Sequence, residues 1–80
     1  MTTDPYVVGT VGVLSVATRG ADGPGEVLLT VRGGSESYLA WSERPLPRGA
    51  MVLVVESRGA RAVDVVAWSG PSASASESPG

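Results

Sequence analysis

The stretch that decides the fold runs Gly25-Glu26-Val27-Leu28-Leu29-Thr30-Val31-Arg32-Gly33-Gly34 and continues as Glu36-Ser37-Tyr38-Leu39-Ala40-Trp41-Ser42. In its first part Val27, Leu29 and Val31 alternate with polar residues, so one face is apolar and the other is largely polar. A period of two predicts a half-buried β-strand, because successive side chains point to opposite faces. Gly33-Gly34 can supply the positive φ angles of a tight reversal before a second β-prone run. The stretch therefore predicts the central hairpin of a small antiparallel barrel.

Five segments of the 80-residue chain favour strands, at residues 7–18, 25–32, 36–42, 50–57 and 60–68. The apolar phase changes midway through the first, where Gly9 and Gly12 would allow a β-bulge; one long strand with both faces covered is the alternative. The run at residues 51–55 is apolar on both faces and predicts a strand deep in the sheet. Arg58-Gly59 predicts the turn into the last strand.

The connections contain no helix signal. Pro45 and Pro47 exclude a helix or a central strand between residues 43 and 49, and we expect Leu46 between them to close the barrel end. The predicted fold class is therefore all-β, a small five-stranded Greek-key barrel of the OB type without the usual helix; an SH3-like barrel is the alternative. We expect a flexible lead-in at residues 1–6, the barrel at 7–68 and a disordered Ser/Ala/Pro/Gly tail at 69–80.

The composition excludes most site chemistry. The chain has no cysteine and no histidine, all six basic residues are arginine, and the formal net charge is −2. Thiolate or imidazole metal sites and the usual general bases are therefore missing. Single, scattered carboxylates favour a solvated surface over a metal site. We expect no enzymatic activity, no cofactor and no metal.

The longest uncharged run, residues 5–18, is shorter than the ~20 residues of a membrane-spanning helix and contains two glycines. The first residues also lack the positive charge that begins a signal peptide. We therefore expect a cytoplasmic protein without direct membrane insertion.

A series of glycines, apolar pairs and a Tyr-x-Ala-x-Ser motif follows in a characteristic order. It comprises Gly9-x-x-Gly12, Pro24-Gly25-x-Val27, Gly33 or Gly34 before Tyr38-x-Ala40-x-Ser42, Leu46-x-x-Gly49-x-x-Val52-x-Val54, the Gly59 turn and Val63-x-Val65. This order is similar to the C-terminal soluble domain of NfeD-like proteins and covers residues 8–66. The resemblance implies a helix-free OB barrel that works as a non-enzymatic protein-interaction module.

The resemblance also implies partners. NfeD-like proteins are associated with flotillin-, stomatin- and prohibitin-type membrane scaffold proteins, so a scaffold of that kind could recruit this chain to a membrane. Members typically carry the domain after transmembrane helices, sometimes with a Clp-like serine protease domain, and this sequence contains neither. Met1 and the polar tail favour a free-standing short form over a fragment. Homo-oligomerisation is a further expectation.

The candidate partner surface comprises Arg32, Leu39, Trp41 and Trp68. The period of two places Tyr38 with Ala40 on the inner face of the third strand and Leu39 with Trp41 on the outer face. Trp41 could instead cap the barrel as part of the core, and Trp68 could cover a barrel mouth or join the patch. Strand addition at an open barrel edge is a second docking route.

Binding of single-stranded nucleic acid is the alternative function, since OB barrels often use stacked aromatic rings and a basic groove. Tyr38 and Trp41 could supply the rings and Arg32 a positive charge. The balance of acidic and basic residues along the barrel argues against such a groove. We therefore expect a protein partner.

Overall fold

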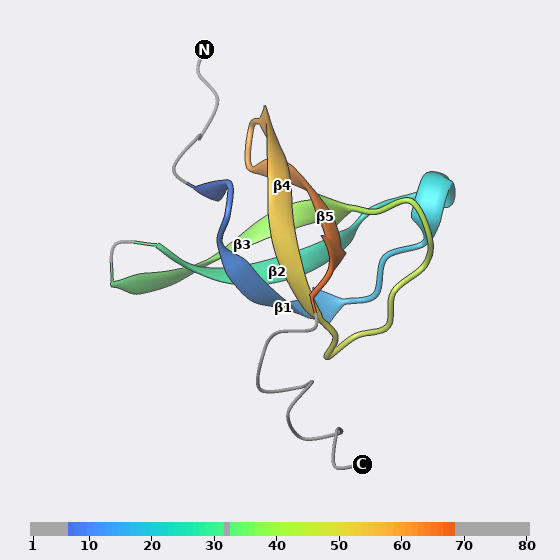
Figure 1. The fold of residues 1–80 in the computed structure, drawn as a ribbon, viewed down its shortest axis with the longest axis horizontal. Coiled ribbons are helices and arrows are strands. Elements are labelled where there is room, and N and C mark those ends of the chain that lie inside the picture. The colour runs from blue at the N-terminus through green and yellow to red at the C-terminus, as the bar shows by residue number, and fades with distance from the viewer. Residues whose placement is uncertain (1–6, 32, 69–80) are drawn as a thin grey trace, which may run out of the picture.

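The computed structural model describes residues 7–31 and 33–68, so the expectations for Arg32, the lead-in and the tail lie outside the described residues. Five strands form the domain: β1 (Val11–Val16), β2 (Gly25–Val31), β3 (Gly34–Trp41), β4 (Met51–Gly59) and β5 (Ala62–Ala67). A single 3-10 turn, η2 (Gly20–Asp22), lies in the loop between β1 and β2. The described residues contain no α-helix (Figure 1).

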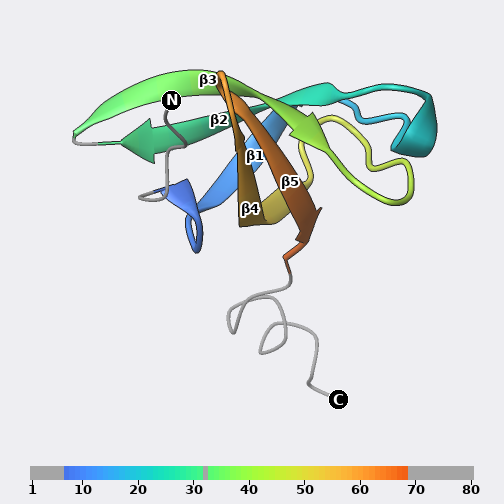
Figure 2. The same ribbon diagram turned by 90° about the horizontal axis from the view of Figure 1, so that it is seen from above.

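The strands close into a barrel in the order β1-β2-β3-β5-β4, and β1 pairs with β4 to complete it. All neighbours are antiparallel except β3 and β5, which run parallel. The last strand therefore lies between the third and the fourth, as in an OB-type barrel. This arrangement confirms the predicted all-β class and the five-stranded OB-type barrel. Figures 1 and 2 show the β2–β3 and β4–β5 hairpins extending in different directions from the barrel.

The core consists of the inward-facing side chains of all five strands. They are Leu14, Val27, Leu29, Tyr38, Ala40, Val52, Val54, Val63 and Val65, joined by Val7 before β1. The period of two therefore placed Tyr38 and Ala40 correctly. Leu46 is half-buried and packs against this cluster from the connector between β3 and β4.

One buried hydroxyl holds that connector in place. Thr18 Oγ1 accepts a 2.8 Å hydrogen bond from the backbone N–H of Leu46 and lies 2.7 Å from Ser42 Oγ. The backbone N–H of Thr18 in turn donates to the carbonyl of Leu46 at 3.0 Å. Because Thr18 is almost fully buried, these bonds satisfy a polar group that would otherwise destabilise the fold.

The bulge of the first strand lies later than predicted. The register against β2 shifts between Leu14 and Val16, not at Gly9 or Gly12. Gly25 lies opposite this irregularity, and a Cβ there would collide with the backbone carbonyls of Val16 and Ala17. The bulge therefore depends on the close approach that glycine permits on the facing strand.

Both hairpin turns differ from the predicted positions. Val31 pairs with Gly34, so the first turn contains Gly33, with φ of 83°, while Gly34 already belongs to β3. The prediction of a turn at Arg58-Gly59 was wrong. A register shift near Gly59 lengthens β4, and the chain reverses at Ala60 and Arg61, with φ of 53° and 59°.

The prediction of deep burial for residues 51–55 was also wrong. Val52 and Val54 are buried, but Met51 and Val55 are exposed and Leu53 is half-buried. The reason is that a five-stranded barrel has a single layer. One side of β4 faces the core, whereas no other element of the described chain covers its outer side.

Candidate functional site

Three residues of the predicted partner surface, Leu39, Trp41 and Trp68, lie in the described part of the chain, and Trp68 lies apart from the other two. Leu39 is exposed on the outer face of β3, where it pairs with Glu26 of β2 and Ala62 of β5. Trp41 lies on the same face but is half-buried. Trp68 follows β5 and lies opposite Met51 of β4, because its backbone N–H donates to the Met51 carbonyl at 2.9 Å. Trp68 therefore belongs to a different part of the barrel surface from Leu39 and Trp41.

An arginine covers Trp41. The Cζ atom of Arg58 lies 4.7 Å from the centroid of the Trp41 ring. The same guanidinium binds both carboxylate oxygens of Asp64, which is the cross-strand partner of Trp41, with the shortest contact at 2.7 Å. The hydrogen bond to Asp64 raises the pKa of Arg58 above its usual value. Bidentate pairing with Asp64 holds the guanidinium over the ring. Arg58 therefore covers part of the Trp41 side chain, and less of that side chain is accessible to a partner.

A second arginine covers Tyr38. Arg61 Cζ lies 5.1 Å from the centroid of the Tyr38 ring, and Arg61 Nη1 forms a 2.9 Å ion pair with Glu36. Tyr38 itself is only 2% exposed. The ring cannot stack on a nucleobase while it faces the core. The structure therefore removes one of the two aromatic rings on which the nucleic-acid alternative depended.

A group of exposed apolar side chains lies elsewhere, on the outer surface of β2, β1 and β4. Val13 pairs with Leu28 on one side and with Met51 on the other. All three side chains are more than 40% exposed, and Trp68 extends the row beyond Met51. Outward-facing residues in register on adjacent strands are neighbours, so these four form a continuous row.

A second row lies beside the first. Leu53 pairs with Val11 of β1 and with Val66 of β5, and Val66 is exposed. We refer to the uncharged surface made by these outward residues as the apolar face: Val13, Leu28, Met51, Leu53, Val66 and Trp68. Large apolar patches are uncommon on monomeric proteins and mark interaction sites.

Sequence reasoning identified only one member of this face, Trp68. A signal for two more was present, because the uninterrupted apolar run at residues 51–55 supplies Met51 and Leu53. Such a run predicts burial on both sides of the strand, which a single-layered barrel does not provide. Val13 of β1 and Leu28 of β2 join the face through the pairing registers of β1 with β4 and β2, and the apolar run does not reveal those registers.

The described residues form neither a metal-binding cluster nor a membrane-spanning helix. Residues 7–31 and 33–68 contain no group of three or more acidic, histidine or cysteine side chains that could hold a metal ion. Nor does this part of the chain include a helix of the length and hydrophobicity required to cross a bilayer. A pocket of about 310 Å³ lies between residues 65–67 of β5 and the connector after β3.

Comparison with known proteins agrees with the fold. No curated protein matches the chain significantly. Among solved structures, the C-terminal domain of stomatin operon partner protein 1510-C from Pyrococcus horikoshii superposes with a TM-score of 0.63, at 21% identity over 85% of this chain and 97% of that one. The soluble domain of the NfeD protein YuaF from Bacillus subtilis gives a TM-score of 0.61 and 31% identity, covering 74% of this chain and 70% of that one. Residues 11–66 match the NfeD C-terminal domain, and the chain belongs to that family.

Proposed function

We propose that this domain is a non-enzymatic protein-interaction module that docks a stomatin- or flotillin-type scaffold protein through its apolar face. The observation that carries the proposal is the uncharged row Leu28–Val13–Met51, formed by register across three strands and extended by Trp68. Exposed aliphatic and aromatic side chains without charge are typical of the centre of a protein interface. The missing histidine, cysteine and lysine support a role in contact rather than catalysis.

The class of partner comes from relatives. One structural neighbour is described as a stomatin operon partner and another as the soluble domain of an NfeD protein. The proposed location of this chain is accordingly cytoplasmic, at a membrane to which the scaffold recruits it. The face around Leu39 and Trp41 is the competing docking surface. A second copy of the chain is the competing occupant of the apolar face.

Two matched variants test the proposal. Met51→Glu places a charge in the apolar face, whereas Leu39→Glu places the same charge at a similarly exposed position, 44% against 49%, on the β3 surface. Binding to the purified stomatin-type scaffold of the same organism, reconstituted in vesicles, is measured by calorimetry. We expect Met51→Glu to weaken binding by at least about 30-fold, as for a residue worth about 2 kcal/mol in an interface. We expect Leu39→Glu to change it less than about threefold, within the small effect of most interface positions.

Each other outcome is decisive. A larger effect of Leu39→Glu would transfer the docking site to the β3 surface. If neither variant affected binding, or if the wild-type chain did not bind the scaffold, the proposal would be wrong. Sedimentation velocity of the same proteins identifies a self-associating apolar face, which Met51→Glu would then dissociate.

A further inference from the structure

Strand β5 extends beyond its pairing with β3. The β3–β5 ladder ends at Trp41 and Asp64, but β5 continues to Ala67. Within the part of the chain that the structure describes, residues 65–67 pair only with β4, through Val54, Leu53 and Val52. Beyond Trp41 the chain leaves the sheet for the connector that Thr18 anchors. One side of residues 65–67 is therefore a strand edge within the otherwise closed barrel.

The hydrogen-bond phase determines which peptide groups this edge presents. The N–H of Trp68 donates to Met51 of β4, while the carbonyl of Arg61 accepts from Leu39 of β3. Peptide groups alternate in direction along a strand, so even-numbered residues of β5 bond to β4 and odd-numbered residues face the β3 side. Val54, which lies opposite Val65, supports this assignment. Its N–H donates to the carbonyl of Thr10 and its carbonyl accepts from the N–H of Gly9, so neither group bonds to Val65. The carbonyl of Val65 and both peptide groups of Ala67 therefore face the side on which β3 has ended.

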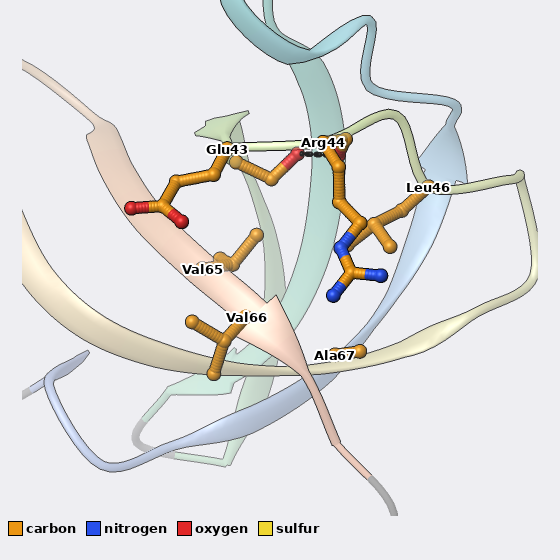
Figure 3. Close-up of a pocket in the computed structure, with 7 residues that line it drawn as sticks. Glu43, Arg44, Leu46, Val65, Val66 and Ala67 are labelled. Atoms are coloured by element: carbon orange, nitrogen blue, oxygen red, sulfur yellow. Dashed lines mark hydrogen bonds between the residues drawn. The ribbon is translucent and has the colours of Figure 1, made fainter.

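The 310 Å³ pocket lies at this edge. Ser42, Glu43, Arg44 and Leu46 line it from the connector, and residues 65–67 line it from β5. Figure 3 shows Glu43 and Arg44 extending to opposite sides of the pocket, with Val65 and Val66 below them. Opposite charges at the rim do not favour an anionic ligand such as a phosphate. The lining is otherwise largely apolar, and its volume is sufficient for a large aliphatic side chain.

We infer that the edge of β5 at residues 65–67, together with this pocket, binds an extended segment of a partner protein by strand addition, with one aliphatic side chain of the segment in the pocket. Only a main chain supplies donors and acceptors at the spacing of a strand edge, and alternate side chains of an added strand enter pockets beside it. The added strand would continue the line of β3 along β5. This site shares Val66 with the apolar face, but it is formed by the edge of β5 and the connector, and it does not depend on the proposed scaffold partner.

Peptide selection tests the inference without a known partner. Phage-displayed random heptapeptides are panned on the full chain, and the enriched sequences are synthesised and measured by fluorescence anisotropy. We expect enrichment of sequences with alternating aliphatic residues. Ala67→Pro removes the outward N–H that an added strand would use, and it should weaken peptide binding at least tenfold. The substitution should leave the β4–β5 pairing intact, because β4 accepts no hydrogen bond from that N–H. Ala67→Ser, which keeps the N–H, and Met51→Glu on the apolar face should leave the affinity within threefold.

Amide hydrogen exchange gives a second measurement that requires no variant. In the free protein the Ala67 amide should exchange fast and the Val66 amide slowly, because only the latter bonds to β4. Saturation with an enriched peptide should slow exchange of the Ala67 amide by at least tenfold. The inference is overturned if no peptide is enriched, if Ala67→Pro binds the peptides as well as the wild-type chain does, or if bound peptide leaves the Ala67 amide unprotected.

Discussion

Two parts of the barrel differ in how their apolar side chains are covered. On the β3–β5 side, the rings of Trp41 and Tyr38 each lie under an arginine that is itself paired with a carboxylate. On the β1–β4 side, Val13 and Met51 lie open and next to each other. We call the first region the arginine-covered side. The difference teaches that residue type alone does not identify a docking surface. A tryptophan can be covered by side chains of its own chain, while aliphatic side chains remain accessible to a partner.

Tyr38→Ala should show the largest effect, because it removes a buried ring from the arginine-covered side. Deletion of a large core side chain costs about 3–5 kcal/mol of the free energy of unfolding. Urea denaturation followed by circular dichroism measures it, with Tyr38→Phe as the control that keeps the ring and should lose less. A loss below about 1 kcal/mol would mean that Tyr38 is not the core residue that its burial indicates.

Trp41→Ala and Met51→Ala compare the two sides directly. Trp41 is half-buried beneath Arg58, so its truncation should cost about 1–2 kcal/mol, part of the value for a fully buried large side chain. Met51 is 49% exposed, and its truncation should stay within about 0.5 kcal/mol. The same urea experiment applies. If Met51→Ala lost more stability than Trp41→Ala, the comparison would be wrong, because the exposed side chains of the β1–β4 side would then stabilise the fold.

Ala60→Gly examines the turn that positions Arg61 over Tyr38. Ala60 has a φ of 53°, in the left-handed region that is unfavourable for residues with a Cβ. Glycine removes that strain, and we expect a gain of about 0.5–1 kcal/mol in the free energy of unfolding. The matched control is Ala62→Gly in β5, which should destabilise by about the same amount. Destabilisation by both variants would contradict a strained turn.

A change of pH should have the smallest effect. The folded-state pKa of Arg58 is raised by Asp64, so the stability from this pair is present below the usual arginine pKa and lost only as pH rises through the raised value. Both values lie far above neutrality, and the chain contains no histidine. The urea midpoint should therefore agree within error at pH 6 and pH 9. A clear difference between the midpoints at pH 6 and pH 9 would show that a group other than Arg58 titrates in this range and changes the stability.

Much of the fold was predictable because strand formation is local. Alternation at Val27, Leu29 and Val31 predicted β2, and the same period placed Tyr38 and Ala40 inward. The errors concern features that depend on pairing. The bulge near Ser15 requires the close approach of Gly25 across the sheet, and the reversal at Ala60 and Arg61 follows from a register shift near Gly59.

The candidate site was less predictable for the same reason. The sequence contains Trp41 and Trp68 but does not show that Arg58, seventeen positions after Trp41, lies over its ring. Nor can it show that Val13 lies between Leu28 and Met51, since those contacts depend on two separate strand registers.

The amino-acid sequence by itself determined two things, because periodicity and composition are properties of the chain alone. The alternation of apolar residues determined a small valine-rich barrel, and the composition determined that histidine, cysteine and lysine are absent. The tertiary structure decided which outward side chains became neighbours, which ring an arginine covered and where β5 was left without β3 beside it. The physical reason is that closing a barrel brings residues distant in sequence into register, and only that register determines what one side chain contacts on the next strand.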